Sequence, residues 1–162
     1  MKIESAEIRY LILPLISPWR TAYGEDADIH SVLVRMQSGD NEGWGETTPF
    51  FAPFYSPETA SSCYFLLSEL FAPRLVGETI DSPEELLARL LPFKGNPFAK
   101  GGIESAWWML ESTIQGKPLH QLLGGKTRNI DAGADFGIQD SYDMLLESIQ
   151  GAVDRGFNRV KL

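Results

Sequence analysis

The sequence has little cysteine, few basic residues relative to acidic ones, and no long apolar run. Cys63 is the only cysteine, so no intrachain disulfide can form, and its apolar helical surroundings predict a buried, inert thiol. No apolar run approaches the roughly 18 residues that a membrane-spanning helix needs. The N-terminal residues 1–5 also lack the apolar block of a signal peptide. We therefore expect a cytoplasmic protein without a membrane partner.

Positive charge is also scarce. The chain has 22 acidic and 14 basic side chains, which gives a net charge of −8. Nucleic acids and anionic membranes attract proteins with a positive field, so the charge argues against both partners. The 162 residues, 43% of them hydrophobic, suffice for one ordinary domain with its own core.

The first third of the chain alternates apolar and other residues with the period of β-strands. The predicted strands are 8–13, 32–37 and 44–48. Pro14 is expected to end the first of them. Turn residues at 38–43 predict that the second and third strands form a hairpin. Residues 17–28, between the first two strands, are predicted as a loop that is unusually aromatic.

The middle of the chain predicts helices. Ser56-Pro57-Glu58 and Asp81-Ser82-Pro83 each place an N-cap residue before a proline. The first helix is expected to run toward Leu70 and to be closed by Pro73 and Gly77. A third helix has the clearest pattern, with apolar residues at i, i+3, i+4, i+7 and i+11. These residues are Ile103, Ala106, Trp107, Leu110 and Ile114.

The remaining segments change period again. Gly116 is the expected C-cap of the third helix, and residues 118–123 form a short further turn. Alternation at 130–136, helical spacing at 141–155 and a strand pattern at 157–162 then predict a βαβ unit. The order is an antiparallel sheet, a helical bundle and the opening of an α/β domain.

Several stretches in this order resemble the N-terminal part of an enolase-superfamily enzyme of the muconate-lactonizing type. They include Gly43-Trp44-Gly45-Glu46, the segment Phe50 to Glu58, the segment Phe93 to Glu104, and Gly116 to Gly125. The second and third look particularly like o-succinylbenzoate synthases and N-acylamino acid racemases. The resemblance implies an α+β fold, with residues 1–125 as the capping domain and 126–162 as the incomplete start of a (β/α) barrel.

The resemblance also implies a catalytic role for Lys161. In this family a Lys-x-Lys strand carries the proton-abstracting lysine, and alternate strand residues point the same way. Lys161 fills the first lysine position, and the second would be residue 163, beyond this sequence. Two neighbouring ammonium groups lower each other's affinity for protons, which suits a base. Because the proton-abstracting lysine would be residue 163, we expect this chain alone to be inactive.

The resemblance further implies Mg²⁺ in the parent enzyme. Proton removal α to a carboxylate leaves an enediolate, a dianion that a divalent cation stabilises. The family's metal ligands lie on later barrel strands, so we expect no acidic residue of this chain to be a ligand and no cation bound to it. Asp135 stands where the family often has a serine that faces the substrate, and its carboxylate would repel an anionic substrate.

The substrate pocket is expected to involve aromatic residues of the capping domain. By resemblance, Trp19 and Tyr23 on the first loop, with Phe50 and Tyr55 on the second, line the pocket for the part of the substrate that does not react. The alternative for Trp19 and Phe50 is an ordinary core position. Arg20 suits either a substrate carboxylate or a plain surface position.

The implied function is therefore that of a lyase or isomerase acting on a small carboxylate, either an o-succinylbenzoate synthase or an N-acylamino acid racemase. A muconate cycloisomerase or dipeptide epimerase is the alternative within the superfamily. A non-catalytic capping or assembly domain is the alternative of another class. Exposed apolar strands at the end of the chain also predict a homo-oligomer.

Overall fold

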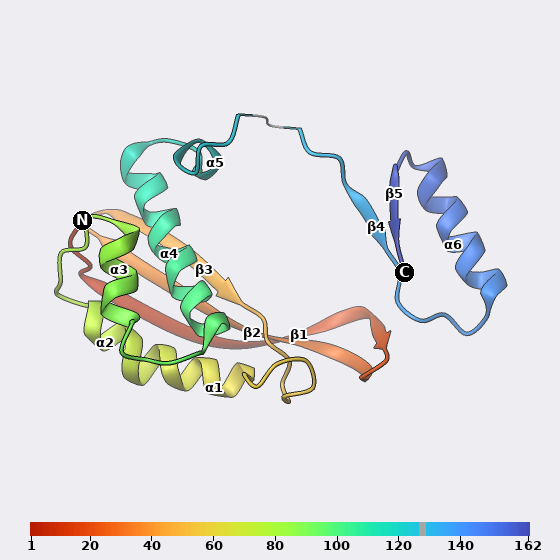
Figure 1. Ribbon diagram of the computed structural model, residues 1–162, viewed down its shortest axis with the longest axis horizontal. Helices are drawn as coiled ribbons and strands as arrows, with labels where there is room; N and C mark the ends of the chain where they lie inside the picture. The colour runs from red at the N-terminus through yellow and green to blue at the C-terminus, as the bar shows by residue number, and fades with distance from the viewer. Residues whose placement is uncertain (127–128) are drawn as a thin grey trace. The chain divides into compact units, whose positions relative to one another are not determined.

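The computed structural model describes residues 1–126 and 129–162, which form two compact units (Figure 1). The first unit comprises Met1–Leu13 and Ile29–Gly125, and the second comprises Pro14–Asp28 and Lys126–Leu162. In the described part of the chain, no helix is long and apolar enough to cross a membrane.

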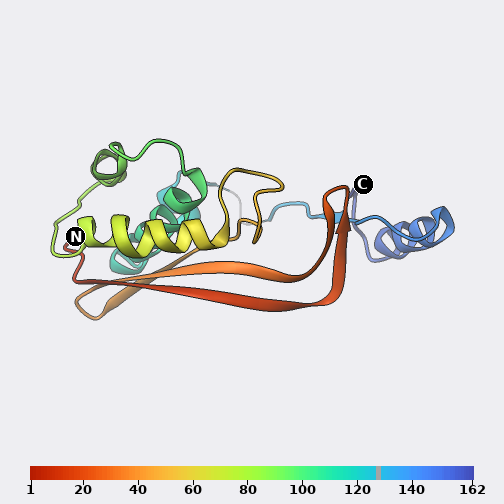
Figure 2. The same cartoon turned by 90° about the horizontal axis from the view of Figure 1, so that it is seen from below.

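A three-stranded antiparallel sheet opens the chain. Its strands are β1 (Ser5–Thr21), β2 (Gly24–Ser38) and β3 (Asn41–Thr47), in the order β1-β2-β3. In the first unit, the helices cover one face of this sheet (Figure 2). The alternate residues Val32, Val34 and Met36 of β2 are fully buried, as the period-2 pattern predicts.

The prediction that Pro14 ends the first strand was wrong. β1 continues through Pro14 and Pro18 to Thr21, and the predicted loop 17–28 is instead the tip of the β1–β2 hairpin. β1 is an edge strand, where a proline can lack its N–H without removing a ladder bond. Ala22 and Tyr23 form the turn, followed by Gly24 with φ +136°, which favours glycine.

The first helical run also differs from its prediction. It consists of α1 (Ala60–Phe65), the π-helix η1 (Leu66–Phe71) and α2 (Ala72–Leu75). Its N-cap is Thr59, which forms a reciprocal capping box with Ser62, and not Ser56. Pro73 does not close the run but lies in the first turn of α2. The π turn comes directly before Pro73, whose ring and missing N–H disturb the preceding turn.

The other helices of the first unit follow their predicted signals. Ser82 caps α3 (Pro83–Leu90) by accepting the N–H of Glu85. The helix α4 (Pro97–Gln115) ends at Gly116, which adopts the left-handed conformation at φ +60°. The short α5 (Leu119–Leu122) follows. The apolar faces of these helices and of the sheet make one core, whose largest fully buried members include Ile3, Met36, Leu67, Phe71, Leu75, Ile103 and Leu110.

β3 and α4 are in direct backbone contact at two glycines. A Cβ added to Gly43 would lie 2.6 Å from the Cα of Leu110, and one added to Gly45 would lie 2.5 Å from the backbone nitrogen of Ala106. Side chains do not approach a backbone so closely, so this contact admits only glycine. Trp44, between the two glycines, packs with the guanidinium of Arg35 at 5.7 Å from its ring centroid.

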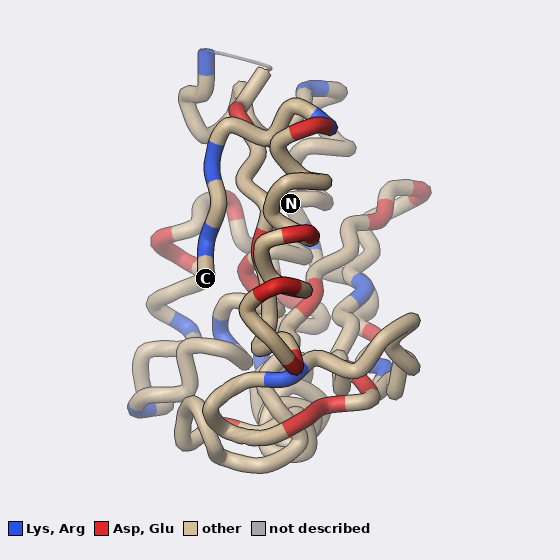
Figure 3. Tube along the Cα trace, turned by 90° about the vertical axis from the view of Figure 1, so that its right-hand side faces the viewer, with Lys and Arg blue, Asp and Glu red and all other residues tan. Residues whose placement is uncertain are grey.

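The second unit contains a βαβ element. Its strands β4 (Gly133–Asp135) and β5 (Arg159–Lys161) are parallel neighbours, joined through α6 (Tyr142–Asp154). Ser141 caps α6 by accepting the N–H of Met144. β4 is shorter than the predicted strand 130–136, because it extends only along the three residues of β5 that pair with it. In Figure 3, β5 carries basic positions beside the C-terminus, whereas α6 carries acidic ones.

Candidate active site

The ends of β4 and β5 bring two of the predicted site residues together. Asp135 lies opposite Lys161 in the parallel register, and the Lys161 Nζ donates to the Asp135 Oδ2 at 3.4 Å. Both side chains are exposed, at 53% for Asp135 and 78% for Lys161, so water screens the pair and it adds little to stability. A pair held this weakly can exchange partners, which leaves the Lys161 ammonium available to another carboxylate.

Arg159 is a residue of this site that the sequence analysis missed. It lies opposite Gly133, and a Cβ added to Gly133 would be 2.8 Å from the Arg159 Nε. Because alternate strand residues share a face, Arg159 and Lys161 lie on the same side of the two strands as Asp135. The spacing Arg159-x-Lys161 could have indicated this position, since it places both residues on one face of a strand. This face therefore carries two cations and one carboxylate.

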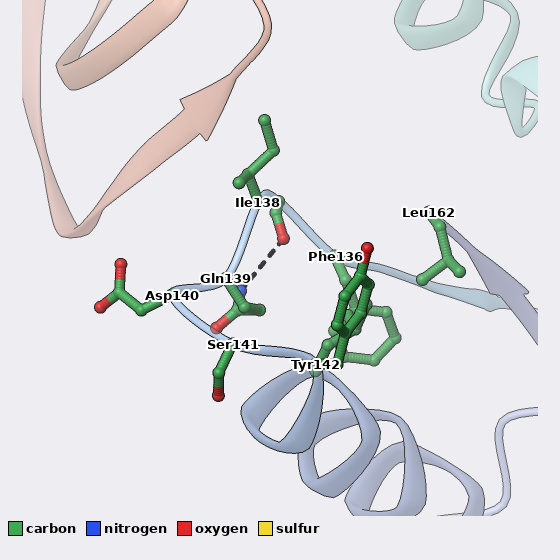
Figure 4. Close-up of a pocket in the computed structure, with 9 residues that line it drawn as sticks. Phe136, Ile138, Gln139, Asp140, Ser141, Tyr142 and Leu162 are labelled. Carbon is green, nitrogen blue, oxygen red and sulfur yellow. Dashed lines mark hydrogen bonds between the residues drawn. The ribbon is translucent and has the colours of Figure 1, made fainter.

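A cavity of about 400 Å³ lies elsewhere in the second unit (Figure 4). Its wall includes Phe136 and Leu162, which directly follow Asp135 and Lys161 and so point to the opposite face. Tyr142 and Leu145 of α6 complete its apolar side. Neither Asp135 nor Lys161 lines this cavity, so it is distinct from the strand face that carries the predicted catalytic lysine.

Trp19 and Tyr23 lie at the tip of the β1–β2 hairpin, in the second unit. Trp19 is near the end of β1, and its ring lies 3.5 Å from the position of a Cβ added to Gly137. Tyr23 is in the turn and is 56% exposed. The guanidinium of the neighbouring Arg20 is occupied by the carboxylates of Glu25 and Asp140.

Phe50 and Tyr55 lie together in the first unit. Their rings meet edge to face with centroids 6.2 Å apart, and both line a cavity of about 270 Å³ with Phe98 at the start of α4. The wall is completed by Thr48, Pro49 and Ser56. The cavity is almost wholly apolar in character, which suits the non-reacting part of a ligand better than its charged end.

Nucleophile and metal chemistry find little support in the described residues. Burial raises the pKa of the Cys63 thiol to about 12, with the nearby Glu58 carboxylate adding to the shift, so the thiol is not a nucleophile at neutral pH. Within residues 1–126 and 129–162, no three His, Cys, Asp or Glu side chains gather as a metal site. These residues do not fit the magnesium ion that the family resemblance implies.

The fold and this strand face define a class: an enolase-type capping domain followed by the first parallel strands of an α/β domain. The family model for the N-terminal domain of mandelate racemase and muconate lactonizing enzyme matches residues 6–124. The chain belongs to this family of the enolase superfamily.

Relatives extend the match over the whole chain. It is 37% identical to N-succinylamino acid racemase of Thermus thermophilus and 35% identical to o-succinylbenzoate synthase of Geobacillus stearothermophilus. Each match covers 100% of this chain but 44% of the relative. A crystal structure of an enolase-superfamily member from Listeria innocua matches with a TM-score of 0.92 at 30% identity, again over 100% of this chain and 44% of that one. The chain thus spans less than half the length of the relatives it matches.

Proposed function

We propose that this chain is the N-terminal portion of an enzyme that removes a proton α to a carboxylate and proceeds through an enediolate. The reaction is that of an o-succinylbenzoate synthase or an N-acylamino acid racemase. The observation that carries the proposal is Lys161 on β5, exposed beside Asp135 in a chain whose relatives include proteins named o-succinylbenzoate synthase and N-succinylamino acid racemase.

In this proposal, Lys161 supplies a fixed positive charge to the substrate carboxylate. Its present partner is Asp135, at 3.4 Å, so a bound carboxylate would take over the ammonium from that side chain. Arg159 adds a second cation on the same face and raises the local attraction for anions. The proton-abstracting base and the magnesium ligands would come from chain beyond residue 162.

The aromatic cavity would serve the rest of the substrate. Phe50, Tyr55 and Phe98 present ring faces and edges that suit an aryl or acyl group. We propose that Trp19 and Tyr23 contribute to the same recognition. A muconate cycloisomerase or dipeptide epimerase activity would use the same lysine with a different carboxylate.

The test begins with the gene. Reading past the codon for Leu162 should reveal a lysine at residue 163 and acidic residues at later strand ends. The longer protein, with magnesium, should exchange the α-proton of an N-succinyl amino acid for deuterium in D₂O, followed by proton NMR. Lys161→Met should abolish this exchange, and Lys117→Met, at an exposed lysine of the first unit, should leave it unchanged. Exchange that persists in Lys161→Met would rule out the proposed role.

A non-catalytic capping or assembly role is the second candidate, and one observation favours it. Ile130, Tyr142 and Leu162 in the second unit are 86%, 85% and 76% exposed, so these apolar side chains are accessible to a second copy or another partner. The gene reading separates the two candidates, because an assembly domain requires neither the second lysine nor the later acidic residues.

A further inference from the structure

The loop at residues 48–59, which connects β3 to α1 (Figure 1), carries two nested pairs of aromatic side chains. The outer pair is Phe50 and Tyr55, which line the cavity of about 270 Å³. The inner pair is Phe51 and Phe54, whose rings meet edge to face with their centroids 5.9 Å apart. Each inner residue directly follows or precedes an outer one. A displacement of the inner pair is therefore passed to the outer pair through a single rigid peptide unit.

The inner pair packs against a histidine of the sheet. The ring centroid of His30, in β2, lies 5.6 Å from that of Phe51. His30 is itself held by Tyr10 of β1, because the Tyr10 Oη and the His30 Nδ1 share a hydrogen bond at 2.5 Å and the two rings meet edge to face. Tyr10 in turn contacts Tyr64 of α1 at 6.1 Å between centroids. These residues all belong to the first unit, and their separations are those of favourable aromatic pairs.

The middle of the loop depends on this contact for its position. The ends of the loop are joined by the backbone, since the N–H of Ala60 donates to the carbonyl oxygen of Phe50 at 3.1 Å. Phe51 and Phe54 are 54% and 53% exposed, so the inner pair is not enclosed by the core. A loop with few buried apolar contacts has low local stability. The loss of one ring contact, that with His30, therefore changes its conformational equilibrium measurably.

We propose that His30 is a positioning residue for the aromatic cavity. By holding Phe51 and Phe54 it fixes the separation of Phe50 and Tyr55, and so determines which aryl or acyl groups the cavity accepts. His30 does not line the cavity, so it acts through the loop. The inference rests on the proposed function in one respect, because it takes this cavity as the place for the non-reacting part of the substrate.

The first measurement is the nuclear Overhauser effect between the rings of Phe50 and Tyr55 in the intact chain. His30→Ala should weaken it, because the loop loses its support. Tyr10→Phe keeps a ring but removes the hydrogen bond to His30, so it should weaken the effect less. The double variant should lose no more than His30→Ala alone, since the two residues act in one series of contacts.

The matched control is His120→Ala. His120 is the other histidine of the chain, lies on α5, and is partly buried like His30. The same chemical change there should leave the Overhauser effect between Phe50 and Tyr55 as it is in the unmodified chain.

The second measurement is the affinity for N-methylbenzamide, a neutral aryl amide, titrated into the chain while the Tyr55 ring is followed by NMR. His30→Ala should raise the Kd by roughly two- to ten-fold, the factor that corresponds to one aromatic contact. Leu86→Ala, at a fully buried position of α3, should lower the stability of the chain but leave the Kd unchanged at a temperature where every variant is folded. This comparison separates positioning from a general loss of stability.

An Overhauser effect in His30→Ala equal to that of the unmodified chain would overturn the proposal, and so would an equal rise of the Kd in Leu86→Ala. A probe that fails to bind the unmodified chain would contradict the recognition role of the cavity in the proposed function. The Overhauser effect between Phe50 and Tyr55 would then decide the role of His30 by itself.

Discussion

The carboxylate of Glu58 caps α4, a helix that begins far from it in the sequence. Its Oε1 accepts the N–H of Phe98 at 2.9 Å, and its Oε2 accepts the N–H of Ala99 at 3.0 Å. The helix lacks a cap of its own because Asn96, its N-cap residue, is left-handed at φ 57° and makes no capping bond. Glu58 is only 3% exposed, so its charge is stabilised chiefly by these donors and by the helix dipole.

Glu58→Ala should lower the free energy of unfolding by at least about 1–3 kcal/mol, the cost of leaving buried donors without partners. Urea denaturation followed by circular dichroism measures the change. Glu84→Ala is the control, because Glu84 is an exposed acid in the first turn of α3 and bonds no such donors. Equal stability losses in the two variants would contradict a special role for Glu58.

Gly45→Ala should destabilise the chain by about 1–3 kcal/mol or more, because the new methyl group meets backbone atoms of α4 that cannot rotate away. Gly101→Ala is the comparison, because Gly101 lies in α4 itself and no atom lies within 4 Å of a Cβ added there. That variant should be stabilised by about 0.5–1 kcal/mol, since alanine is the better helix former. Thermal melts of both variants provide the comparison, and opposite signs are expected.

Cys63 should resist alkylation by iodoacetamide at pH 8 in the folded chain and react rapidly in urea. Its pKa is about 12 when folded, against 9.0 for a free thiol. The folded chain keeps the proton while the unfolded chain loses it, so this group's contribution to stability is complete below pH 9 and declines between pH 9 and 12. The stability of Cys63→Ala should fall less steeply than that of the unmodified chain between pH 9 and 12. An identical slope would count against the raised pKa of Cys63.

The isolated chain should show no racemase or dehydratase activity with magnesium, and calorimetry should detect no stoichiometric magnesium site. Without a base and a metal, most of the transition-state stabilisation is missing. Manganese, tested in parallel, serves as a check on the calorimetry. Turnover of N-succinyl amino acids above a heat-inactivated control would show that the essential groups lie within these residues after all.

The purified chain should self-associate through its second unit. Light scattering should give a mass above that of one chain, and Leu162→Glu should shift the mass toward that of a monomer because it places a charge on an apolar surface. Leu91→Glu is a fair control, since Leu91 is 68% exposed in the first unit. A strictly monomeric unmodified chain would disprove the prediction.

Local signals predicted the elements well wherever the deciding chemistry is local. Ser82 caps the helix that follows it, and Gly116 ends α4 in the left-handed conformation. The apolar period of α4 matches its buried face, including Ile103 and Leu110. In each case the residues that decide the structure lie within the element or next to its end.

The errors arose where distant parts of the chain decide the outcome. Pro14 was expected to end a strand, but its effect depends on β1 being an edge, which only the sheet order determines. Glu58 was placed in a helix start, whereas its carboxylate bonds residues 40 and 41 positions later. Arg159 was overlooked because its position over Gly133 requires the parallel register of β4 and β5.

The backbone contact between β3 and α4 also affects how this architecture is recognised in other sequences. At Gly43 and Gly45 no side chain separates strand from helix, so no compensating change in a neighbour makes room for a larger residue. Trp44, on the other face, is 36% exposed and packs against arginines, where other large side chains have room. In a search for distant members of the fold, the two glycines therefore carry more information than the more conspicuous tryptophan between them.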